Sequence, residues 1–184
     1  MNIPLEPIDN TFSRRLEARG FQVQRGFTDA VAQALHEGAN DPVITKYTHD
    51  GNKFQTPELV RRWHENPLRE HVVYSLADRA VSGVVWFATA PSQFSDASQN
   101  FNIRIYEGAR DRSLAADFLE AAHEDFTETQ GGDDTWALVH RQNALAKNLL
   151  LRHHYQIGHQ SKSHMTMTRI ADPERRYNPL KKVI

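Results

Sequence analysis

The residues with the clearest chemical potential form one short run, Arg110-Asp111-Arg112-Ser113-Leu114-Ala115. A loop that leads from a strand into a helix presents unpaired backbone N–H groups at the positive end of the helix dipole, which suits an anion. Small residues such as Ser113 and Ala115 let the backbone approach a phosphate closely, and Arg110 and Arg112 add charge-assisted hydrogen bonds. The run therefore predicts a pyrophosphate site, and it equally fits a solvated helix start.

Hydrophobic periodicity predicts the elements on both sides of this run. From Phe101 to Tyr106, apolar and polar residues alternate, as in a strand with one buried face. After the run, apolar residues recur at helical spacing until the glycines near Gly131 end the helix. These residues are Leu114, Phe118, Leu119, Ala122 and Phe126.

A second strand and helix follow directly. The stretch Trp136 to Val139 reads as a strand, and Asn143 is a good N-cap for the next helix. The expected apolar stripe of that helix is Leu145, Ala146, Leu149 and Leu150.

The flanking regions complete an α/β pattern. The sequence predicts a strand at Phe21 to Val23, a helix capped by Thr28, and a helix from Thr56-Pro57-Glu58 to about Glu65. A hairpin turning at Asp78-Arg79 follows, and strands at 155–157 and 165–170 close the chain. This order predicts an α/β sandwich with a mixed central sheet and helices on both faces.

Two linked motifs resemble the GNAT superfamily of acetyl-CoA-dependent N-acetyltransferases. The family signature Arg/Gln-x-x-Gly-x-Gly/Ala is similar to Arg110-x-x-Ser113-x-Ala115, with serine in place of the first glycine. The family's Val-x-x-x-Asn, followed by Ala, reappears as Val139 to Asn143 and Ala146. The resemblance covers roughly residues 21–170 and implies a GNAT-type acyl-CoA N-acyltransferase fold.

The resemblance also implies where acetyl-CoA, the co-substrate, binds. The outer edge of the strand Ile103-Arg104-Ile105 would hold the pantetheine arm by main-chain hydrogen bonds and polarise the thioester carbonyl. The run from Arg110 to Ala115 would hold the pyrophosphate. Asn143 would contact the cofactor near its amides, and it also has the simpler role of helix cap.

The catalytic groups usual in this family are absent. Leu150 stands where many members have a tyrosine acid, and Gln99 or Asn100 where some have a base. Possible substitutes are Tyr106, Glu107 just after the strand, and His153 and His154 at the end of a helix. Of these, Glu107 and His153 are the catalytic candidates. Glu107 also fits a solvated loop acid, and His153 also fits a favourable partner of the helix dipole.

Three functions follow from this pattern. The leading hypothesis is an N-acetyltransferase that transfers an acetyl group directly to an amine of a small molecule or a protein. The alternative is a catalytically silent GNAT-fold module that binds acyl-CoA or regulates a partner. A weaker third reading is a metal site, but the spacing of His153, His154, His159 and His164 matches no standard zinc pattern, so we expect no metal.

Composition narrows the class further. The 184 residues carry a formal net charge of -1 with both signs interspersed, which predicts neither a nucleic-acid nor a membrane partner. The absence of cysteine excludes a thiolate nucleophile. No signal peptide or membrane span is evident, so a cytoplasmic protein is expected. We expect one domain at 21–170, with an N-terminal arm at 1–20 and a C-terminal tail at 171–184 that leave a homodimer open.

Overall fold

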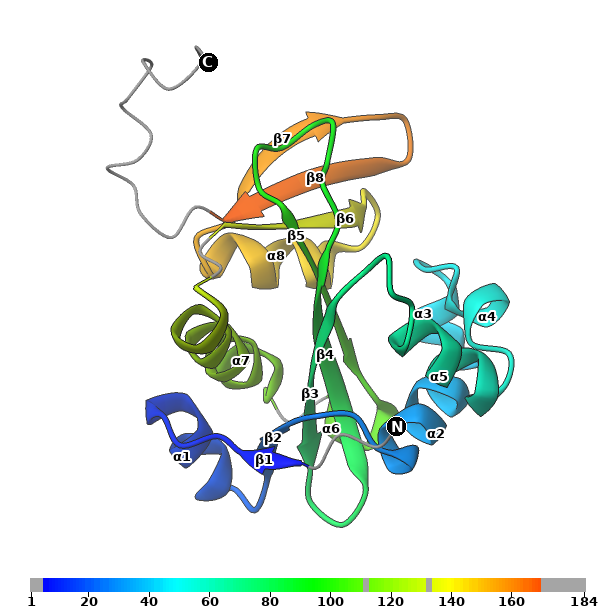
Figure 1. The fold of residues 1–184 in the computed structure, drawn as a ribbon. Helices are drawn as coiled ribbons and strands as arrows, with labels where there is room; N and C mark the ends of the chain where they lie inside the picture. Colours follow the sequence, from blue (N-terminus) through cyan, green and yellow to red (C-terminus); the bar gives the residue numbers. More distant parts are fainter. Residues whose placement is uncertain (1–4, 111–112, 132–133, 170–184) are drawn as a thin grey trace.

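A computed structural model describes residues 5–110, 113–131 and 134–169. Its elements are β1 (Glu6–Pro7), α1 (Thr11–Glu17), β2 (Gln22–Arg25), α2 (Asp29–Gly38), α3 (Pro42–Thr45), α4 (Asp50–Lys53), α5 (Pro57–His64), β3 (His71–Ala77), β4 (Val81–Thr89), β5 (Gln99–Ile105), α6 (Glu107–Arg110), α7 (Ala115–Gln130), β6 (Thr135–His140), α8 (Ala144–Arg152), β7 (Gln156–Gln160) and β8 (His164–Arg169). Figure 1 shows one sheet between two layers of helices.

The described strands form one mixed sheet in the order β1-β2-β3-β4-β5-β6-β8-β7. Every neighbouring pair is antiparallel except β5 and β6, which are parallel. Helices α1, α7 and α8 cover one face of the sheet, and α2 to α5 cover the other (Figure 1). The predicted mixed sheet with helices on both faces is therefore confirmed.

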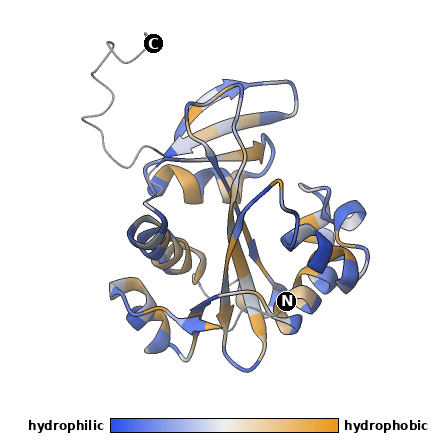
Figure 2. Cartoon of the chain, in the orientation of Figure 1, coloured by the Kyte–Doolittle hydropathy of each residue, from blue (hydrophilic) through white to orange (hydrophobic). Residues whose placement is uncertain are grey.

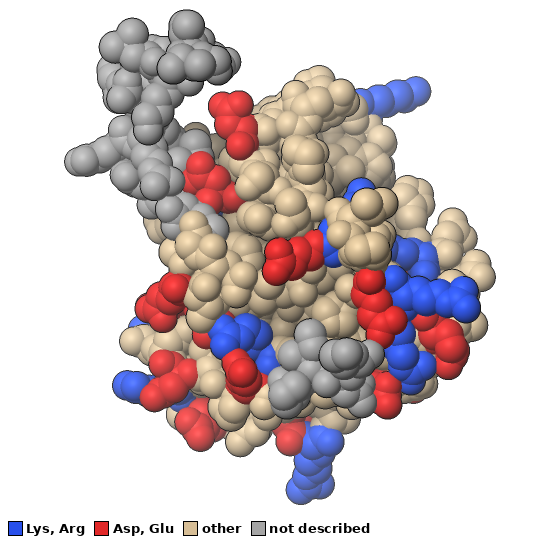
Figure 3. Space-filling model, viewed as in Figure 1, with Lys and Arg blue, Asp and Glu red and all other residues tan. Residues whose placement is uncertain are grey.

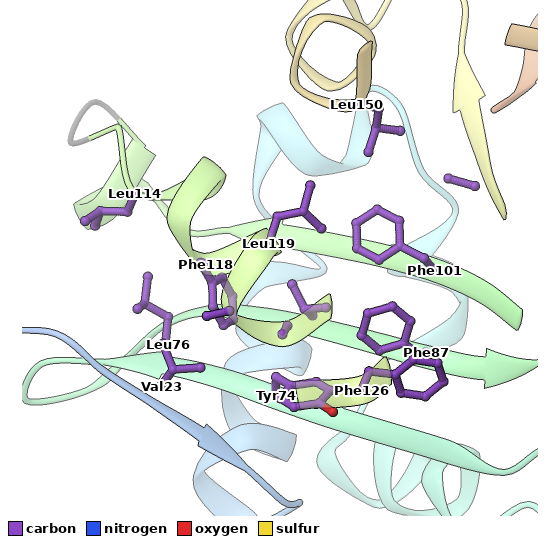
Figure 4. Close-up of a cluster of buried hydrophobic side chains, with 14 of the residues drawn as sticks. Val23, Tyr74, Leu76, Phe87, Phe101, Leu114, Phe118, Leu119, Phe126 and Leu150 are labelled. Carbon is purple, nitrogen blue, oxygen red and sulfur yellow. The ribbon is translucent and has the colours of Figure 1, made fainter. Parts of the chain in front are cut away.

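Each face of the sheet has its own hydrophobic core. Phe87 and Trp86 are neighbours on β4, so their side chains point to opposite faces. Phe87 stacks on Phe126 of α7 with ring centroids 4.1 Å apart (Figure 4). On the other face, Trp86 meets Phe54 edge to face at 6.3 Å. Figure 2 shows apolar residues concentrated along the sheet and on the helix sides that face it.

Several local signals act as predicted. The Thr28 and Thr56 hydroxyls accept hydrogen bonds from the N–H groups of Val31 and Leu59, and Pro57 occupies the first turn of α5. Gly131 ends α7 with a φ of 62°, a conformation that favours glycine.

The expected arm at 1–20 differs from the structure. Its described part, residues 5–20, forms β1, which pairs with β2, and α1, which packs on α7. Leu16 is fully buried, and Asn10 begins α1 with a capping box. The sequence pattern missed this because a seven-residue helix buries only one or two side chains. The expected tail at 171–184 lies outside the described residues.

Two further expectations need correction. Leu145 does not join the buried stripe of α8, because 81% of its surface is exposed. The segments between the longer elements also contain the short helices α3, α4 and α6. Asp41 and Pro42 start α3 by the usual cap and first-turn proline, but four residues are too few to show a period.

Candidate functional site

The parallel strands β5 and β6 separate after their first residues. Their register contains only Gln99 opposite Thr135 and Asn100 opposite Trp136, and the strands then diverge as a wedge. A pocket of about 310 Å³ occupies this wedge. Its lining residues come from both strands, from the segment between α3 and α4, from the first residue of that α4 helix, from α8 with its cap, and from β8: Tyr47, Thr48, His49, Asp50, Asn100, Phe101, Asn102, Ile103, Arg104, Trp136, Ala137, Leu138, Val139, His140, Asn143, Ala146, Leu149, Leu150 and His164.

The edge of β5 turns its main-chain groups toward this wedge. The Tyr106 N–H donates to the Ser82 carbonyl at 3.0 Å, which sets the alternation of the antiparallel ladder with β4. Ile103 and Ile105 therefore direct their N–H and C=O groups away from β4. Their carbonyls accept hydrogen bonds from the guanidinium groups of Arg104 at 2.8 Å and Arg110 at 3.0 Å. The Ile103 and Ile105 N–H groups face the wedge.

The start of α7 has no side-chain cap. Leu114 is the N-cap residue and makes no side-chain capping hydrogen bond, so the first N–H groups of this 16-residue helix lack that partner. Ser113 has a φ of 51°, the left-handed conformation that glycine adopts most readily. The backbone at Ser113 thus has the shape of the signature glycine although the residue is serine. Asp111 and Arg112 lie outside the described residues.

Arg110 has a different position from the one expected. It ends the short helix α6, and its guanidinium forms an ion pair with Asp41, the cap of α3. Burial raises the pKa of Asp41, but the Arg110 guanidinium and the Val43 N–H offset this, so the pKa lies below its ordinary value. Arg110 therefore ties the loop before α7 to α3.

Asn143 and the α8 side chains close the wedge from the other side. The side-chain Oδ1 of Asn143 accepts a hydrogen bond from the Ala146 N–H at 3.1 Å, so the predicted helix cap is confirmed. Leu150, at the position of the missing tyrosine, lines the pocket with only 2% of its surface exposed. The wedge between β5 and α8 is therefore apolar on its inner side.

Three imidazoles that the sequence pattern did not bring together also line this pocket. His140 on β6 is paired in register with His164 on β8, and their ring centroids are 5.1 Å apart. His49 lines the same pocket from the segment before α4, and the ring of Tyr47 lies 5.7 Å from that of His140. Burial lowers the pKa of His164, and the neighbouring His140 and His49 lower it further.

The tautomer of His140 follows from its surroundings. Its Nδ1 accepts a hydrogen bond from the Gln142 N–H at 3.3 Å, so Nε2 carries the proton of the neutral ring. Side-chain alternation along β6 and β8 predicts which face of each strand carries its histidine. It brings His140 and His164 together only once the two strands are known to pair.

Comparison with known proteins decides the fold. No family model matches the sequence, and no curated protein matches it. Among solved structures, the chain is similar to the RimL ribosomal L7/L12 alpha-N-protein acetyltransferase in complex with coenzyme A, with a TM-score of 0.67 and 13% identity over 91% of this chain and 99% of that one. It is also similar to the spermidine N-acetyltransferase of Vibrio cholerae in complex with CoA and spermine, with a TM-score of 0.66 and 12% identity over 83% and 96% of the two chains. A GNAT-family acetyltransferase of Streptococcus pneumoniae matches with a TM-score of 0.64 and 15% identity over 83% and 99%. This chain has the GNAT fold.

In this GNAT fold, the two catalytic substitutes considered from sequence lie apart from the pocket. Glu107 is exposed in α6, and His153, the C-cap of α8, is hydrogen-bonded through Nδ1 to the Glu120 carboxylate of α7. Neither residue lines the wedge. His154, the residue after the C-cap of α8, adopts a φ of 64°, a left-handed conformation typical of a helix end.

The four histidines of the weaker metal reading are also dispersed in this fold. His153 pairs with Glu120, whereas His159 stacks on Phe94 with centroids 4.0 Å apart. Only His164 faces the pocket. Within the described ranges, no group of three His, Cys, Asp or Glu side chains is arranged to hold a metal ion.

The surface of this GNAT fold shows no single dominant charge. On the face in Figure 3, acidic and basic side chains are interspersed, and the part over β7 and β8 is mostly uncharged. In the part of the chain that the structure describes, no helix has the length and apolar character to cross a membrane.

Proposed function

We propose that this chain is an acetyl-CoA-dependent N-acetyltransferase that transfers the acetyl group directly to an amine. The observation that carries this proposal is the wedge between β5 and β6, where a strand edge with free N–H groups meets a pocket lined by imidazoles. The GNAT neighbours include complexes with CoA, which supports the same use of the wedge.

The cofactor fits the wedge by its chemistry. The pantetheine arm carries amide groups, and the Ile103 and Ile105 N–H groups on the edge of β5 are donors for their carbonyl oxygens. The pyrophosphate is an anion, and the start of α7 at Ser113, Leu114 and Ala115 offers N–H groups and the positive end of a helix dipole. The adjoining Asp111 and Arg112 belong to the same proposed loop, and Arg104 and Asn143 border the arm.

The acceptor reacts on the imidazole side of the pocket. The amine nitrogen attacks the thioester carbonyl carbon, and the bond from that carbon to sulfur breaks. The proton of the amine passes to His164, because a neutral imidazole is a base suited to neutral pH and the one lone pair of neutral His140 already accepts the Gln142 N–H. The imidazolium then returns this proton to the departing thiolate, so the reaction needs no acid at Leu150.

Titration calorimetry with acetyl-CoA tests the cofactor part of the proposal. Ala146 lines the wedge, and Ala144 lies exposed on the same helix, so Ala146→Phe and Ala144→Phe form a matched pair. We expect the wild type and Ala144→Phe to bind acetyl-CoA and Ala146→Phe to bind at least about tenfold more weakly. Equal affinity of all three proteins would remove the wedge from the cofactor site.

A silent acyl-CoA-binding module is the second candidate. The buried Leu150 favours it, because a leucine at the position of the usual acid has no proton to donate. Release of CoA, followed over a panel of amines and peptides, separates the two functions. Steady release that depends on both the enzyme and an acceptor supports the transferase. Binding without release from any acceptor supports the silent module.

A further inference from the structure

The charged groups of the pocket neutralise one another. Asp50 on α4 and Arg104 on β5 form a two-point ion pair, and the remaining Nη1 of Arg104 donates to the Ile103 carbonyl. Among the described residues that line the pocket, there is no other Asp, Glu, Lys or Arg. The pocket therefore has no spare carboxylate to accept a cation.

This balance disfavours a polyamine as acceptor. A polyamine must lose the proton of one amine to react, and its other ammonium groups stay charged at neutral pH. An ammonium group brought into a partly buried pocket needs a carboxylate or several hydrogen-bond acceptors to replace its water. Asp50, the one carboxylate among the described lining residues, already has both oxygens on Arg104.

The basic groups of the pocket are weak, which favours a weakly basic amine. The titratable side chains that accompany the Asp50–Arg104 pair are His49, His140, His164 and the phenol of Tyr47. An α-amino group has an ordinary pKa of about 8 and a lysine side chain one of about 10.4, so at neutral pH the neutral fraction of the α-amine is roughly 200-fold larger. An imidazole completes the deprotonation of the α-amine more readily.

The uncharged polar groups fit a peptide. The Asn102 side-chain amide donates to the side-chain Oδ1 of Asn100 at 2.6 Å. The Asn100 side-chain amide in turn donates to the Trp136 main-chain carbonyl at 3.3 Å. This chain of amides lies on β5 facing the pocket, beside the start of the wedge. Its members have further donor and acceptor capacity that matches a peptide backbone, which carries one donor and one acceptor per residue.

Building on the proposed transferase function, we propose that the acceptor is the α-amino group of a peptide or protein N-terminus whose first residues are uncharged. The nitrogen–carbon bond forms at the acetyl carbonyl, the carbon–sulfur bond breaks, and the α-amine proton leaves through the imidazoles. The products are an N-terminal acetamide and CoA.

Three matched probes test this acceptor class with the 184-residue chain. The first is a pool of neutral pentapeptide amides with free N-termini that differ in their first two residues. The second is the same pool with acetylated N-termini and one internal lysine, and the third is spermidine. We expect CoA release with kcat/KM at least tenfold higher for the first pool, with the acetyl group located on the N-terminus by mass spectrometry. A preference for spermidine or for the lysine pool would overturn the acceptor class while leaving the transferase intact.

Lack of turnover with all three probes would overturn the acceptor class as well. Calorimetry with acetyl-CoA on the same sample then separates the two claims: binding retains the proposed cofactor site, and loss of binding removes the proposed function itself.

A charge substitution gives a second test. Asn102→Asp adds a carboxylate to the pocket, and Asn148→Asp adds the same charge on an exposed position of α8 outside it. We expect Asn102→Asp to raise the ratio of spermidine to N-terminal peptide turnover at least fivefold relative to wild type and Asn148→Asp to leave it unchanged. An unchanged ratio in both variants would contradict the charge argument.

Discussion

Arg104 on β5 forms a bidentate ion pair with Asp50 on α4: Nε donates to Oδ2 at 2.5 Å and Nη2 donates to Oδ1 at 3.1 Å. The two side chains keep only 13% and 10% of their surface exposed, and the guanidinium lies over the Trp86 ring at 5.0 Å. This pair joins β5, whose edge is the proposed cofactor site, to α4, whose first residue lines the pocket. Bidentate geometry and the aromatic contact both require arginine rather than lysine.

The first prediction concerns this ion pair. Asp50→Asn keeps the side-chain shape but leaves the Arg104 charge nearly buried, so the free energy of unfolding should fall by about 3 kcal/mol. Urea denaturation measures the change. The matched control is Asp9→Asn, which breaks a pair with Arg14 whose side chains are 77% and 67% exposed and should lower the free energy of unfolding far less. Equal losses in the two variants would show that Asp50 contributes no more than a surface pair.

The second prediction concerns the loop before α7. Ser113 occupies a left-handed φ of 51°, which costs a residue with a Cβ roughly 1 kcal/mol relative to glycine. Ser113→Gly should raise the free energy of unfolding by about that amount and should not weaken acetyl-CoA binding. Ser98→Gly is the control, because Ser98 is exposed and lacks a positive φ, and it should be neutral or destabilising. Denaturant unfolding and calorimetry provide the two readouts, and a destabilised Ser113→Gly would refute the strain argument.

The third prediction concerns the pocket imidazoles. Replacing both His140 and His164 by Gln should lower kcat by about 100-fold or more, because a positioned base contributes that much. In the wild type, burial and then His140 and His49 lower the pKa of His164, so the ring stays neutral to lower pH. The acid limb of kcat should therefore lie below pH 6.5, the ordinary histidine value. His159→Gln, which alters a ring stacked on Phe94, should retain full kcat. A double variant with wild-type kcat would dismiss the imidazoles as the base.

The fourth prediction concerns stability in acid. His71 on β3 is buried, and its ring centroid lies 4.3 Å from that of Trp63. Burial, and then the charges of His64 and Lys53, lower the pKa of His71 to about 4. Between about pH 6.5 and 4 the unfolded chain binds a proton that the folded chain does not, so stability falls as the pH falls through this window. The loss attributable to His71 should reach up to about 3 kcal/mol.

His71→Phe preserves the ring contact and removes the titration, so its stability should depend less on pH between 6.5 and 4 than that of the wild type. Denaturant unfolding at a series of pH values gives this dependence. His159→Phe serves as the control and should follow the wild-type curve. If His71→Phe loses as much stability in acid as the wild type does, the buried imidazole is not the cause.

Much of the fold was readable from local patterns. Alternation from Phe101 to Tyr106 predicted β5, helical spacing from Leu114 to Phe126 predicted α7, and the caps at Thr28, Thr56 and Asn143 mark true helix starts. Each of these features depends on residues within a few positions of one another. The short elements β1, α1 and α3 escaped prediction because two to seven residues show little periodicity, and β1 and α1 are held by distant partners, β2 and α7.

The amino-acid sequence by itself determined the strand and helix that flank residues 110–115, and with them the place where a GNAT signature appears. Only the tertiary structure decided which side chains share the pocket. His140 and His164 meet because β6 and β8 pair in register, and Asp50 reaches Arg104 because α4 folds over β5. The same structure turned Arg110 toward Asp41 and His153 toward Glu120. The reason is physical: periodicity encodes which face of an element is buried, whereas strand order and register decide which distant polar groups that burial brings into contact.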